Sequence, residues 1–568
     1  VGRFYETFGN SVPNTMERTL GGNRTSVQWY RPNPPRSATM WSLRNNTNYM
    51  QTGALSAVQF VAENREKILR NYWNKSNNSL DAGREKAPHA WVVPSAQDRK
   101  ADAAYMVNLV QRQGIEVHRA GDDGEFGGIE VAEGDFVIRM DQPYRNYAQT
   151  LMERQDFPED APSPYDDVAW TYPLMFNVDA HPVDDVAILD DLEMEPVVGE
   201  VSLAGSVDTP RRVGSDGFYA VLPAASAHQM RARLALASGG DPVVAAIETA
   251  VEIDDEVTLP PGTWTVSMAD MDQDAMEAWA GEHALQVYRV RAEDLEDVAT
   301  HEVDLPRIAL LHTWSRTQDE GWARFTLDQQ GVPYDYVGED RVADLAPLRD
   351  RYDVILFPHQ GRGANGKRIL QGVDPSDGPI AYTRTPEYPS HGTPDSSEDI
   401  TGGMGFEGLT ALRDFVRDGG TLVTVGSAST LPIEFAFLRD VNTRPAGSIF
   451  VPGSILQGTT VDAENPLTYG YEDRLPLYHQ GGPYFNISNS APGSVAVRYA
   501  PGDAMLLSGV AREAGALGGQ PAVYSERVGE GAVVIYGFDA LHRHQNHGNH
   551  ALIWNAFLHW NDLAQPEE

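Results

Sequence analysis

Four histidines crowd a short segment near the end of the chain, and neutral imidazole is the commonest metal ligand in proteins. The segment HRHQNHGNH carries His542, His544, His547 and His550 within nine residues. A transition-metal site is one interpretation. The only carboxylate close by in the sequence is Asp539, and the segment joins a predicted strand to a predicted final helix. The pattern favours the alternative, a solvated polar loop with His550 near the start of a helix.

A glycine-rich stretch, Gly361–Arg368 (GRGANGKR), follows the strand-like run YDVILFP, which is where a phosphate-binding loop belongs. It satisfies G-x-x-x-x-G-K, but Arg368 stands where such a loop needs Ser or Thr to hold Mg²⁺. The sequence GVDPSDGP follows and would end a helix before its N-terminus could face a phosphate. We predict a flexible surface loop here and no nucleotide site.

A sharp turn, Gly426–Ser429, follows the strand-like run TLVTV. Ser427 could act there as a nucleophile on an elbow, which would make the protein a small-molecule hydrolase. The G-x-S-x-G sequence that normally accompanies such an elbow is missing. The alternative is a turn kept for packing or binding, and the sequence favours it.

Glu6 lies between Tyr5 and Phe8 in a strand-like run, Gly2–Phe8. Aromatic neighbours would partly desolvate its carboxylate and raise its pKa towards a range useful for proton transfer. The alternative is an ordinary glutamate at the end of a strand that caps it or pairs with Arg3.

The composition limits the classes of partner. The net charge is −37, which argues against nucleic acid or an anionic membrane as the main partner. No apolar run approaches the roughly 18 residues of a membrane span. The chain lacks cysteine, which excludes disulfides, thiolate metal sites and cysteine nucleophiles. A length of 568 residues predicts several domains.

Residues 1–79 read as a strand, a polar loop and a long helix capped by Asn46 or Thr47 and ended by NKSNNSLDAG. The apolar positions recur at helical spacing. They are Met50, Ala54, Ala57, Val58, Val61, Ile68, Leu69 and Tyr72. One strand and one helix cannot bury this stripe, so its partner layers are missing from the chain or lie elsewhere in it.

An internal repeat follows. The first copy consists of AWVVP, a helical segment, GIEVHRA and AEGDFVIRM. The second copy consists, in the same order, of FYAVLP, a helical segment, PVVAA and PPGTWTVSM. Pro94 precedes Gly134 by 40 residues, and Pro223 precedes Gly262 by 39. Each copy reads strand, helix, strand, turn, strand, with the glycine allowing the chain to reverse. We predict two related small α/β modules.

From Leu305 the chain alternates between strand and helix patterns. The strand runs are RIALLHT, YDVILFP, TLVTVGSAS and GAVVIYGFD, and the helical patterns are DEGWARFTLDQQG, LTALRDFVRDGG and ALIWNAFLHW. Near-continuous apolar strands joined by helices indicate a parallel sheet covered on both faces.

The stretch FVRDGGTLVTVGSAS in this part resembles the class I glutamine amidotransferase-like family, which has a flavodoxin-like fold. It matches a helix, a Gly-Gly turn, a strand and the turn where that family places its nucleophile. The family needs a cysteine thiolate there and a histidine to activate it. Ser427 stands at this turn, so the resemblance implies a catalytically inactive domain.

The combination of FYETFGN, TMERT, WYRPNPP and WSLRNNTNY resembles the C-terminal edge of the zinc carboxypeptidase (carboxypeptidase A-like) catalytic domain of large bacterial proteins. RMDQPY (Arg139–Tyr144) and PYDDVAW (Pro164–Trp170) extend the resemblance over the whole chain. It implies that Glu6 is the general base. Zinc held by two histidines and a carboxylate polarises a water, and the glutamate takes its proton.

The chain lacks the metal-ligand motif of this family. None of its 15 histidines begins the His-x-x-Glu of the zinc ligands, and the nearest match is His181-Pro-Val-Asp184. The resemblance therefore implies that the zinc ligands, and the arginines for a substrate carboxylate, precede Val1. This chain alone would bind no catalytic zinc and would be inactive. Its partners would be an N-terminal peptidase segment, covalent or separate, and a peptide substrate, in a secreted or periplasmic location.

We accordingly predict an α/β multidomain chain. Residues 1–79 form the C-terminal part of a carboxypeptidase-like domain, 80–175 a small α/β module, 176–304 a second module with a β-rich lead-in, and 305–568 an inactive amidotransferase-like domain. The predicted function is that of a zinc metallocarboxypeptidase that hydrolyses peptide bonds at C-termini. The alternative is a non-catalytic binding or scaffold protein with a degenerate peptidase domain.

Overall fold

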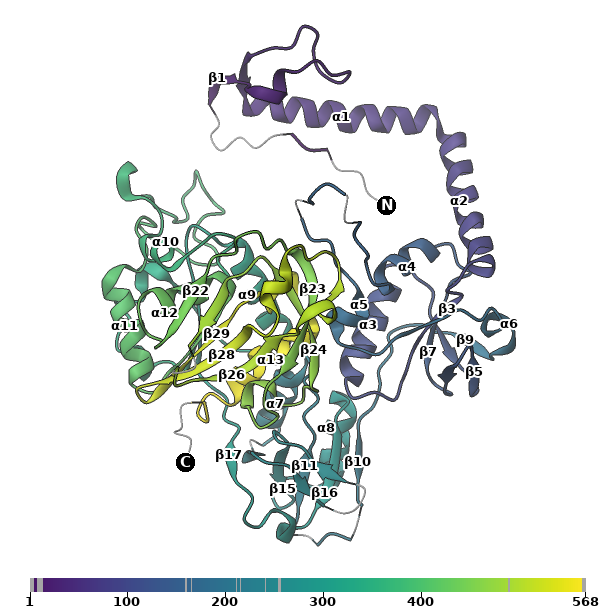
Figure 1. The fold of residues 1–568 in the computed structure, drawn as a ribbon, viewed down its shortest axis with the longest axis vertical. Helices are drawn as coiled ribbons and strands as arrows, with labels where there is room; N and C mark the ends of the chain where they lie inside the picture. The colour runs from purple at the N-terminus through teal and green to yellow at the C-terminus, as the bar shows by residue number, and fades with distance from the viewer. Residues whose placement is uncertain are drawn as a thin grey trace. The chain divides into compact units, whose positions relative to one another are not determined.

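A computed structural model describes residues 5–7, 14–158, 161–164, 166–210, 212–214, 216–240, 242–253, 257–488 and 491–563 (Figure 1). The chain forms two compact units, Val1–Asp81 and Ala82–Glu568. The architecture is mixed α/β, with several separate sheets, two of which contain parallel strand pairs. Among the described helices, none is both long enough and apolar enough to cross a membrane.

The first unit contains a two-stranded antiparallel sheet, a long helix and most of a second long helix, in place of the single helix that the sequence predicts. The bounds are β1 Thr15–Thr19, β2 Ala38–Ser42, α1 Leu43–Glu63 and α2 Arg65–Glu85. The N-cap of α1 is Ser42, whose backbone N–H donates to Asn45 Oδ1 at 3.1 Å. The predicted cap at Asn46 or Thr47 is therefore wrong by one turn, because β2 runs directly into the helix.

The predicted end of the helix at NKSNNSLDAG is also wrong, because α2 continues through that segment. Polar side chains of this segment form hydrogen bonds with the preceding helical turn, and the helix does not end there. Ser76 Oγ donates to the carbonyl oxygen of Tyr72 at 3.0 Å, and Asn77 Nδ2 donates to that of Trp73 at 2.8 Å. Such side-chain bonds to the preceding turn are compatible with a helix interior.

The second unit begins with a five-stranded antiparallel sheet in the order β8-β3-β7-β4-β9. Its strands are β3 Ala90–Val93, β4 His118–Ala120, β7 Phe136–Arg139, β8 His181–Val183 and β9 Met194–Pro196. A hairpin, β5 Gly124–Phe126 and β6 Ile129–Val131, and helices α3 Lys100–Arg112, α4 Arg145–Met152, α5 Tyr172–Phe176 and α6 Ile188–Asp191 complete it. The sequence boundary at 175/176 falls inside this module, because β8 and β9 pair with its sheet.

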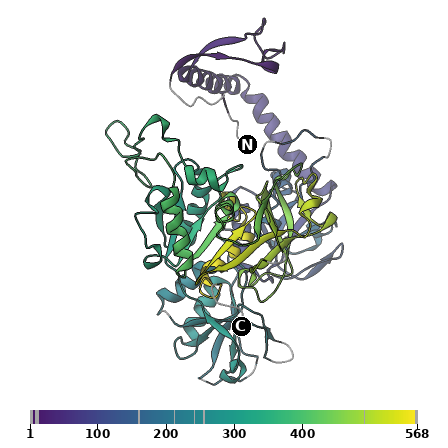
Figure 2. The same cartoon turned by 60° about the vertical axis from the view of Figure 1, so that its left-hand side comes forward.

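The next sheet repeats this order as β16-β11-β15-β12-β17, with β10 added at one edge. Its strands are β10 Ser206–Asp208, β11 Phe218–Val221, β12 Val244–Ile247, β15 Trp264–Ser267, β16 Gln286–Val290 and β17 Thr300–Glu302. The hairpin β13 Val251–Glu252 and β14 Thr258–Leu259 and helices α7 Gln229–Ser238 and α8 Gln273–His283 accompany them. Both views show these teal strands as a sheet of their own (Figures 1 and 2).

The two modules share one strand order, which agrees with the repeated pattern of strand, helix, strand, turn and strand. In each, the first strand pairs with the third, and the second also pairs with the third. The turn glycines before the third strands, Gly134 and Gly262, both have positive φ, +96° and +82°. Side chains are disfavoured in that backbone conformation, which is why the sequence repeats glycine there.

The third sheet begins with five parallel strands in the order β19-β18-β20-β21-β29. They are β18 Ile308–His312, β19 Asp335–Gly338, β20 Val354–Phe357, β21 Thr421–Val425 and β29 Gly531–Tyr536. The helices are α9 Gln318–Gln330, α10 Gly366–Gln371, α11 Gly405–Arg417, α12 Thr430–Glu434 and α13 His547–Leu558. The predicted parallel pattern is thus confirmed for these strands.

The sheet then continues with antiparallel strands that the sequence reading did not include. They are β28 Pro521–Val528, β26 Ser494–Tyr499, β23 Pro452–Thr460 and β24 Arg474–Gln480, with β27 Leu506–Ser508 paired to β23. A separate pair joins β22 Val441–Arg444 and β25 Tyr484–Ile487.

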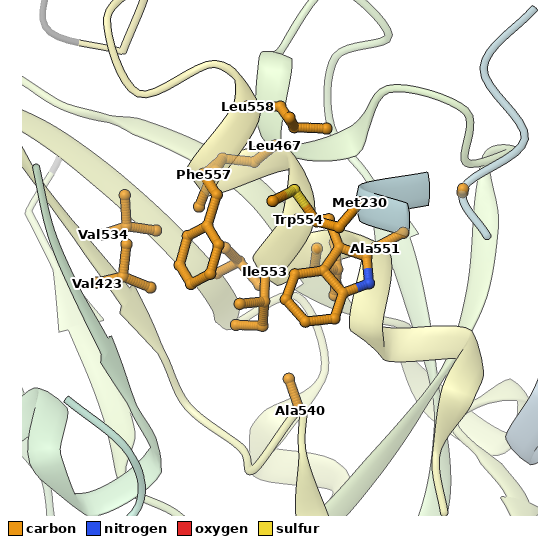
Figure 3. Close-up of a cluster of buried hydrophobic side chains, with 14 of the residues drawn as sticks. Met230, Val423, Leu467, Val534, Ala540, Ala551, Ile553, Trp554, Phe557 and Leu558 are labelled. Carbon is orange, nitrogen blue, oxygen red and sulfur yellow. The ribbon is translucent and has the colours of Figure 1, made fainter. Parts of the chain in front are cut away.

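The final helix, α13, lies at the centre of the largest core. Figure 3 shows Trp554 among side chains from β21 and β29 (Val423 and Val534) and from α7 (Met230). The indole N–H of Trp554 donates to the carbonyl oxygen of Ala227 at 2.9 Å. Every residue of α13 is buried, including its polar residues, so the helix is enclosed by protein on all sides.

Candidate functional site

Glu6 is exposed, and Tyr5–Thr7 belongs to no strand. The remainder of the predicted strand, Gly2–Phe4 and Phe8, lies outside the described residues, as does the alternative partner Arg3. Tyr5 lies against α1, because a Cβ atom built on Gly53 would be 2.8 Å from its Cδ1. The carboxylate of Glu6 is therefore open to solvent beside an aromatic ring that contacts the helix.

The helices α1 and α2 carry many exposed apolar side chains, which together are called the apolar face. Its large side chains are mostly exposed, by 70 % at Leu55, 67 % at Val58 and 65 % at Trp73. Tyr49, Met50, Phe60, Val61, Leu69 and Tyr72 are also exposed. The prediction that strand and helix cannot bury this stripe is confirmed for the described residues.

The carboxyl ends of β20 and β21 bring Ser427 and His359 together. Both are buried, and their Oγ and Nδ1 atoms are 3.3 Å apart. His359 Nδ1 also accepts from the backbone N–H of Ser427 at 2.9 Å, and Ser427 Oγ accepts from the backbone N–H of Gln360 at 3.0 Å. Burial lowers the pKa of His359 and favours its neutral form. These bonds hold the loop that follows β20 against the turn that follows β21.

The glycine-rich loop leads into α10, which has only six residues. Its N-cap is Asn365, whose side chain accepts from the backbone N–H of Arg368 at 3.0 Å. The helix ends before GVDPSDGP, as the sequence predicts. His181 and Asp184, the nearest match to a zinc motif, are exposed and are not brought together with other histidines in a metal-binding group among the described residues.

The four-histidine segment is buried, so the predicted solvated loop is wrong. The exposed fractions are 3 % for His542, 9 % for His544, 2 % for His547 and 0 % for His550. The prediction failed because α9, α7 and α5 cover the segment, and they come from distant parts of the sequence. The prediction that His550 lies near a helix start is confirmed by α13.

These four histidines separate into two environments. His542 Nε2 lies 3.1 Å from Asp167 Oδ2, and its Nδ1 lies 3.6 Å from Asp539 Oδ2. Burial alone would lower the pKa of His542, but its hydrogen bonds to the two carboxylates and their charges outweigh burial and raise it to about 9. Asp319, Asp539 and His542 each offer a potential ligand atom, and these three atoms lie within 4.8 Å of one another. This is an ion-pair environment at the carboxyl edge of the parallel strands.

His544, His547 and His550 form the second environment, and none of the three makes an ion pair among the described residues. Their potential ligand nitrogens lie within 4.8 Å of one another. Burial lowers the pKa of His544 to about 4 and that of the other two well below the usual value. All three imidazoles are therefore neutral at pH 7, the form in which imidazole binds metals.

A cavity of about 360 Å³ opens at the carboxyl end of β18. His312 lines it, stacks on Tyr336 at 4.1 Å between ring centroids and places Nε2 2.9 Å from Asp395 Oδ2. Glu320 also lines it, and burial raises its pKa to about 7. The cavity thus contains a carboxyl group that changes protonation state near neutral pH.

Sequence reasoning missed Asp102, Asp167, His228 and Asp319 as neighbours of the histidine segment. Asp167 stands in PYDDVAW, a string that was notable only as a resemblance. The other three lie within helices or at their caps and carry no local signal. Only the packing of separate modules against α13 brings them close.

Comparisons with known proteins assign no family. No family model matches the chain, and no curated protein matches it. A cytoplasmic protein from Salmonella typhimurium is similar in structure at 13 % identity, covering 44 % of this chain and 98 % of its own, with a TM-score of 0.28.

Two further structures are similar over nearly the same share of the chain. PurLQS from Thermotoga maritima has 15 % identity over 45 % of this chain and 99 % of its own, with a TM-score of 0.28. A β-galactosidase from Bacillus circulans sp. alkalophilus has 11 % identity over 46 % of this chain and 31 % of its own, with a TM-score of 0.26. At these scores the likenesses carry no argument about function.

Proposed function

We propose that this chain supplies the general base, Glu6, and the closing helix of a zinc carboxypeptidase-like catalytic domain whose metal ligands lie in a separate segment. The observation that carries the proposal is the exposed apolar face of α1 and α2. Apolar surface of this extent normally packs against another protein layer. The sequence resemblance identifies that layer as the zinc-binding part of the peptidase domain.

The chemistry assigned to Glu6 requires an accessible carboxylate. Its side chain is exposed in this chain and would become partly desolvated once the second layer covers the helix. Glu6 would then accept a proton from the zinc-polarised water and pass it to the leaving amine. Zinc would act as the Lewis acid, and Glu6 of this chain would move the proton.

For residues 305–568 we infer a flavodoxin-like, amidotransferase-like domain without amidotransferase activity. The strand order β19-β18-β20-β21-β29 corresponds to 2-1-3-4-5 in chain order, the flavodoxin-like order. Ser427 stands where that family needs cysteine, and its Oγ already accepts from the Gln360 backbone N–H.

The experiment compares peptidase activity of the chain alone and of the protein that includes the zinc-binding segment. We expect chelator-sensitive release of C-terminal residues only in the second case, and loss of at least about 100-fold in kcat for Glu6→Gln. Glu17→Gln is the matched control, because Glu17 is also exposed in the first unit. Chelator-sensitive hydrolysis by residues 1–568 alone would overturn the proposal.

The alternative, a scaffold with a degenerate peptidase domain, makes a different prediction. The assembled protein would then bind its partner through the apolar face and show no hydrolysis with or without zinc. Equal activity of Glu6→Gln and the parent protein would also favour that reading.

A further inference from the structure

The three neutral histidines of the second environment meet two more metal-binding side chains from the repeated modules. Asp102 of α3 and His228, the N-cap residue of α7, form a second group with His547, again with ligand atoms within 4.8 Å of one another. His547 belongs to both groups. Five side chains from three parts of the chain therefore belong to two groups that share His547, all in the unit Ala82–Glu568.

Several atoms at this point have no hydrogen-bond partner among the described residues. They are both ring nitrogens of His550, Nδ1 of His547 and Oδ2 of Asp102. His550 is fully buried, so its two nitrogens are not exposed to bulk solvent. Leaving a buried polar atom unpaired costs about 1–3 kcal/mol, and native proteins rarely leave several in one place.

The remaining nitrogens have partners that orient the rings. His544 Nδ1 lies 2.9 Å from Thr326 Oγ1, which leaves its Nε2 for another role. His547 Nε2 lies 3.1 Å from the carbonyl oxygen of His544, which it reaches as a donor, so its Nδ1 carries the lone pair. Metal-binding histidines are commonly held by such a bond from the ring nitrogen that does not bind the metal.

We propose that His544, His547 and His550 bind a first-row transition-metal ion, with Asp102 or His228 as a further ligand. Nε2 of His544, Nδ1 of His547 and one ring nitrogen of His550 would be the ligand atoms. His547 and His550 are three residues apart on α13 and so project from the same helix face. This site is separate from the zinc of the proposed peptidase and rests on different residues.

The donor set selects the class of ion. Three imidazoles without a thiolate suit Zn²⁺, Ni²⁺ or Cu²⁺, and an added carboxylate is compatible with Zn²⁺. Zn–N bonds of about 2.0–2.1 Å place tetrahedral ligand atoms about 3.4 Å apart, and the candidate ligand atoms here lie within 4.8 Å of one another. The aromatic rings of Tyr105 and Phe176 pack against the His547 ring, with 4.8 and 4.6 Å between ring centroids.

The other groups with metal-ligand spacing are weaker candidates. In the group of Asp319, Asp539 and His542, the histidine already has a charge partner outside the group, because Asp167 accepts from His542 Nε2 at 3.1 Å. In the group of Glu248, His301 and Asp562, His301 Nε2 forms a hydrogen bond with His559 Nδ1 at 2.7 Å. Neither group leaves a histidine with both nitrogens unpartnered among the described residues.

The test uses residues 1–568 with Zn²⁺ as the probe. After metal-free purification and addition of Zn²⁺, mass spectrometry of the native protein and elemental analysis should find one tightly held ion per chain. Zinc should raise Tm by about 2 °C or more, because an ion that binds only the folded state stabilises it. Co²⁺ in its place should give visible absorption typical of a four-coordinate nitrogen site.

Two variants locate the ion. His550→Ala and His544→Gln should each lower bound zinc at least tenfold and abolish the zinc-dependent Tm shift. The second variant keeps a polar side chain in case the first does not fold. His479→Ala is the matched control, because His479 is fully buried but has tyrosine hydroxyls near both nitrogens, at 3.0 and 3.4 Å.

The proposal is overturned if the parent chain holds no zinc, or if His550→Ala and His544→Gln retain it at full stoichiometry. The second result would move the ion to another group of the chain. These outcomes do not depend on peptidase activity, so they are independent of the result for Glu6.

Discussion

The carboxylate of Asp167 accepts a hydrogen bond from His542 Nε2 at 3.1 Å across 375 residues of sequence. The same carboxylate accepts from the Tyr478 hydroxyl at 2.5 Å and from Gln480 Nε2 at 2.7 Å. Burial alone would raise the pKa of Asp167, but these bonds and the neighbouring cations lower it to about 2. These bonds hold Asp167 at the carboxyl edge of the parallel strands of the third sheet.

Replacing Asp167 by Ala should destabilise the second unit by about 3 kcal/mol, because it leaves His542 buried without its main charge partner. Thermal or urea unfolding followed by circular dichroism measures the loss. Asp166→Ala is the control, since Asp166 pairs with Arg543 at the surface and should change stability by less than about 1 kcal/mol. Similar losses for both variants would contradict the assigned role of Asp167.

Glu339→Gln should make stability less dependent on pH. Burial raises the pKa of Glu339 from 4.5 to about 8, and the side chain is 1 % exposed. Its contribution is therefore fully present below about pH 4.5 and is lost as the pH rises through about 8. The difference in Tm between variant and parent should grow in favour of the variant from pH 5 to pH 9.

The control for this pH series is Glu407→Gln, an exposed position on α11. It should leave the pH profile of the parent unchanged. A Glu339→Gln profile parallel to that of the parent would show that the carboxyl is ionised in the folded protein.

Ser427→Ala should cost about 1–2 kcal/mol of stability, because the buried Gln360 N–H loses its acceptor. It should leave any peptidase activity intact, in contrast to Glu6→Gln. Ser396→Ala, at an exposed position, is the control for stability. Loss of hydrolytic activity in Ser427→Ala with unchanged Tm would support the small-molecule hydrolase reading instead.

A double replacement, Leu55→Glu with Val58→Glu, should leave the helicity of the first unit nearly unchanged, because both side chains are exposed. It should weaken association with the zinc-binding segment at least tenfold, measured by calorimetry or co-purification. Gln51→Glu adds the same kind of charge to α1 without removing apolar surface and should bind normally. Unchanged association of the double variant would show that this face is not the contact.

The strands of the third sheet were predictable because each buried run is nearly all apolar. β18, β20, β21 and β29 all lie within the predicted runs, and α13 follows where ALIWNAFLHW indicates. The antiparallel strands from β22 to β28 mix polar and apolar residues, so their pairing depends on distant partners. The repeat was readable because strand and glycine positions recur at nearly equal spacing.

The candidate sites were less predictable than the fold. The sequence drew attention to the histidines but gave no sign of their burial, because the covering side chains, such as Tyr105 and Phe176, are far away in the chain. Likewise Asp102 reads as an ordinary first-turn residue of a helix. Local pattern shows which residues could bind a metal; only tertiary packing shows which of them meet.

The repeated strand order has a consequence for how the buried cluster is built. Asp102 and His228 stand at the starts of α3 and α7, the equivalent helices of the two modules, and the backbone N–H of Ala227 donates to Asp102 Oδ1 at 3.3 Å. Each module thus contributes one helix start to the cluster. His547 of α13 meets both of them, so the loosening of either module would change the surroundings of this histidine.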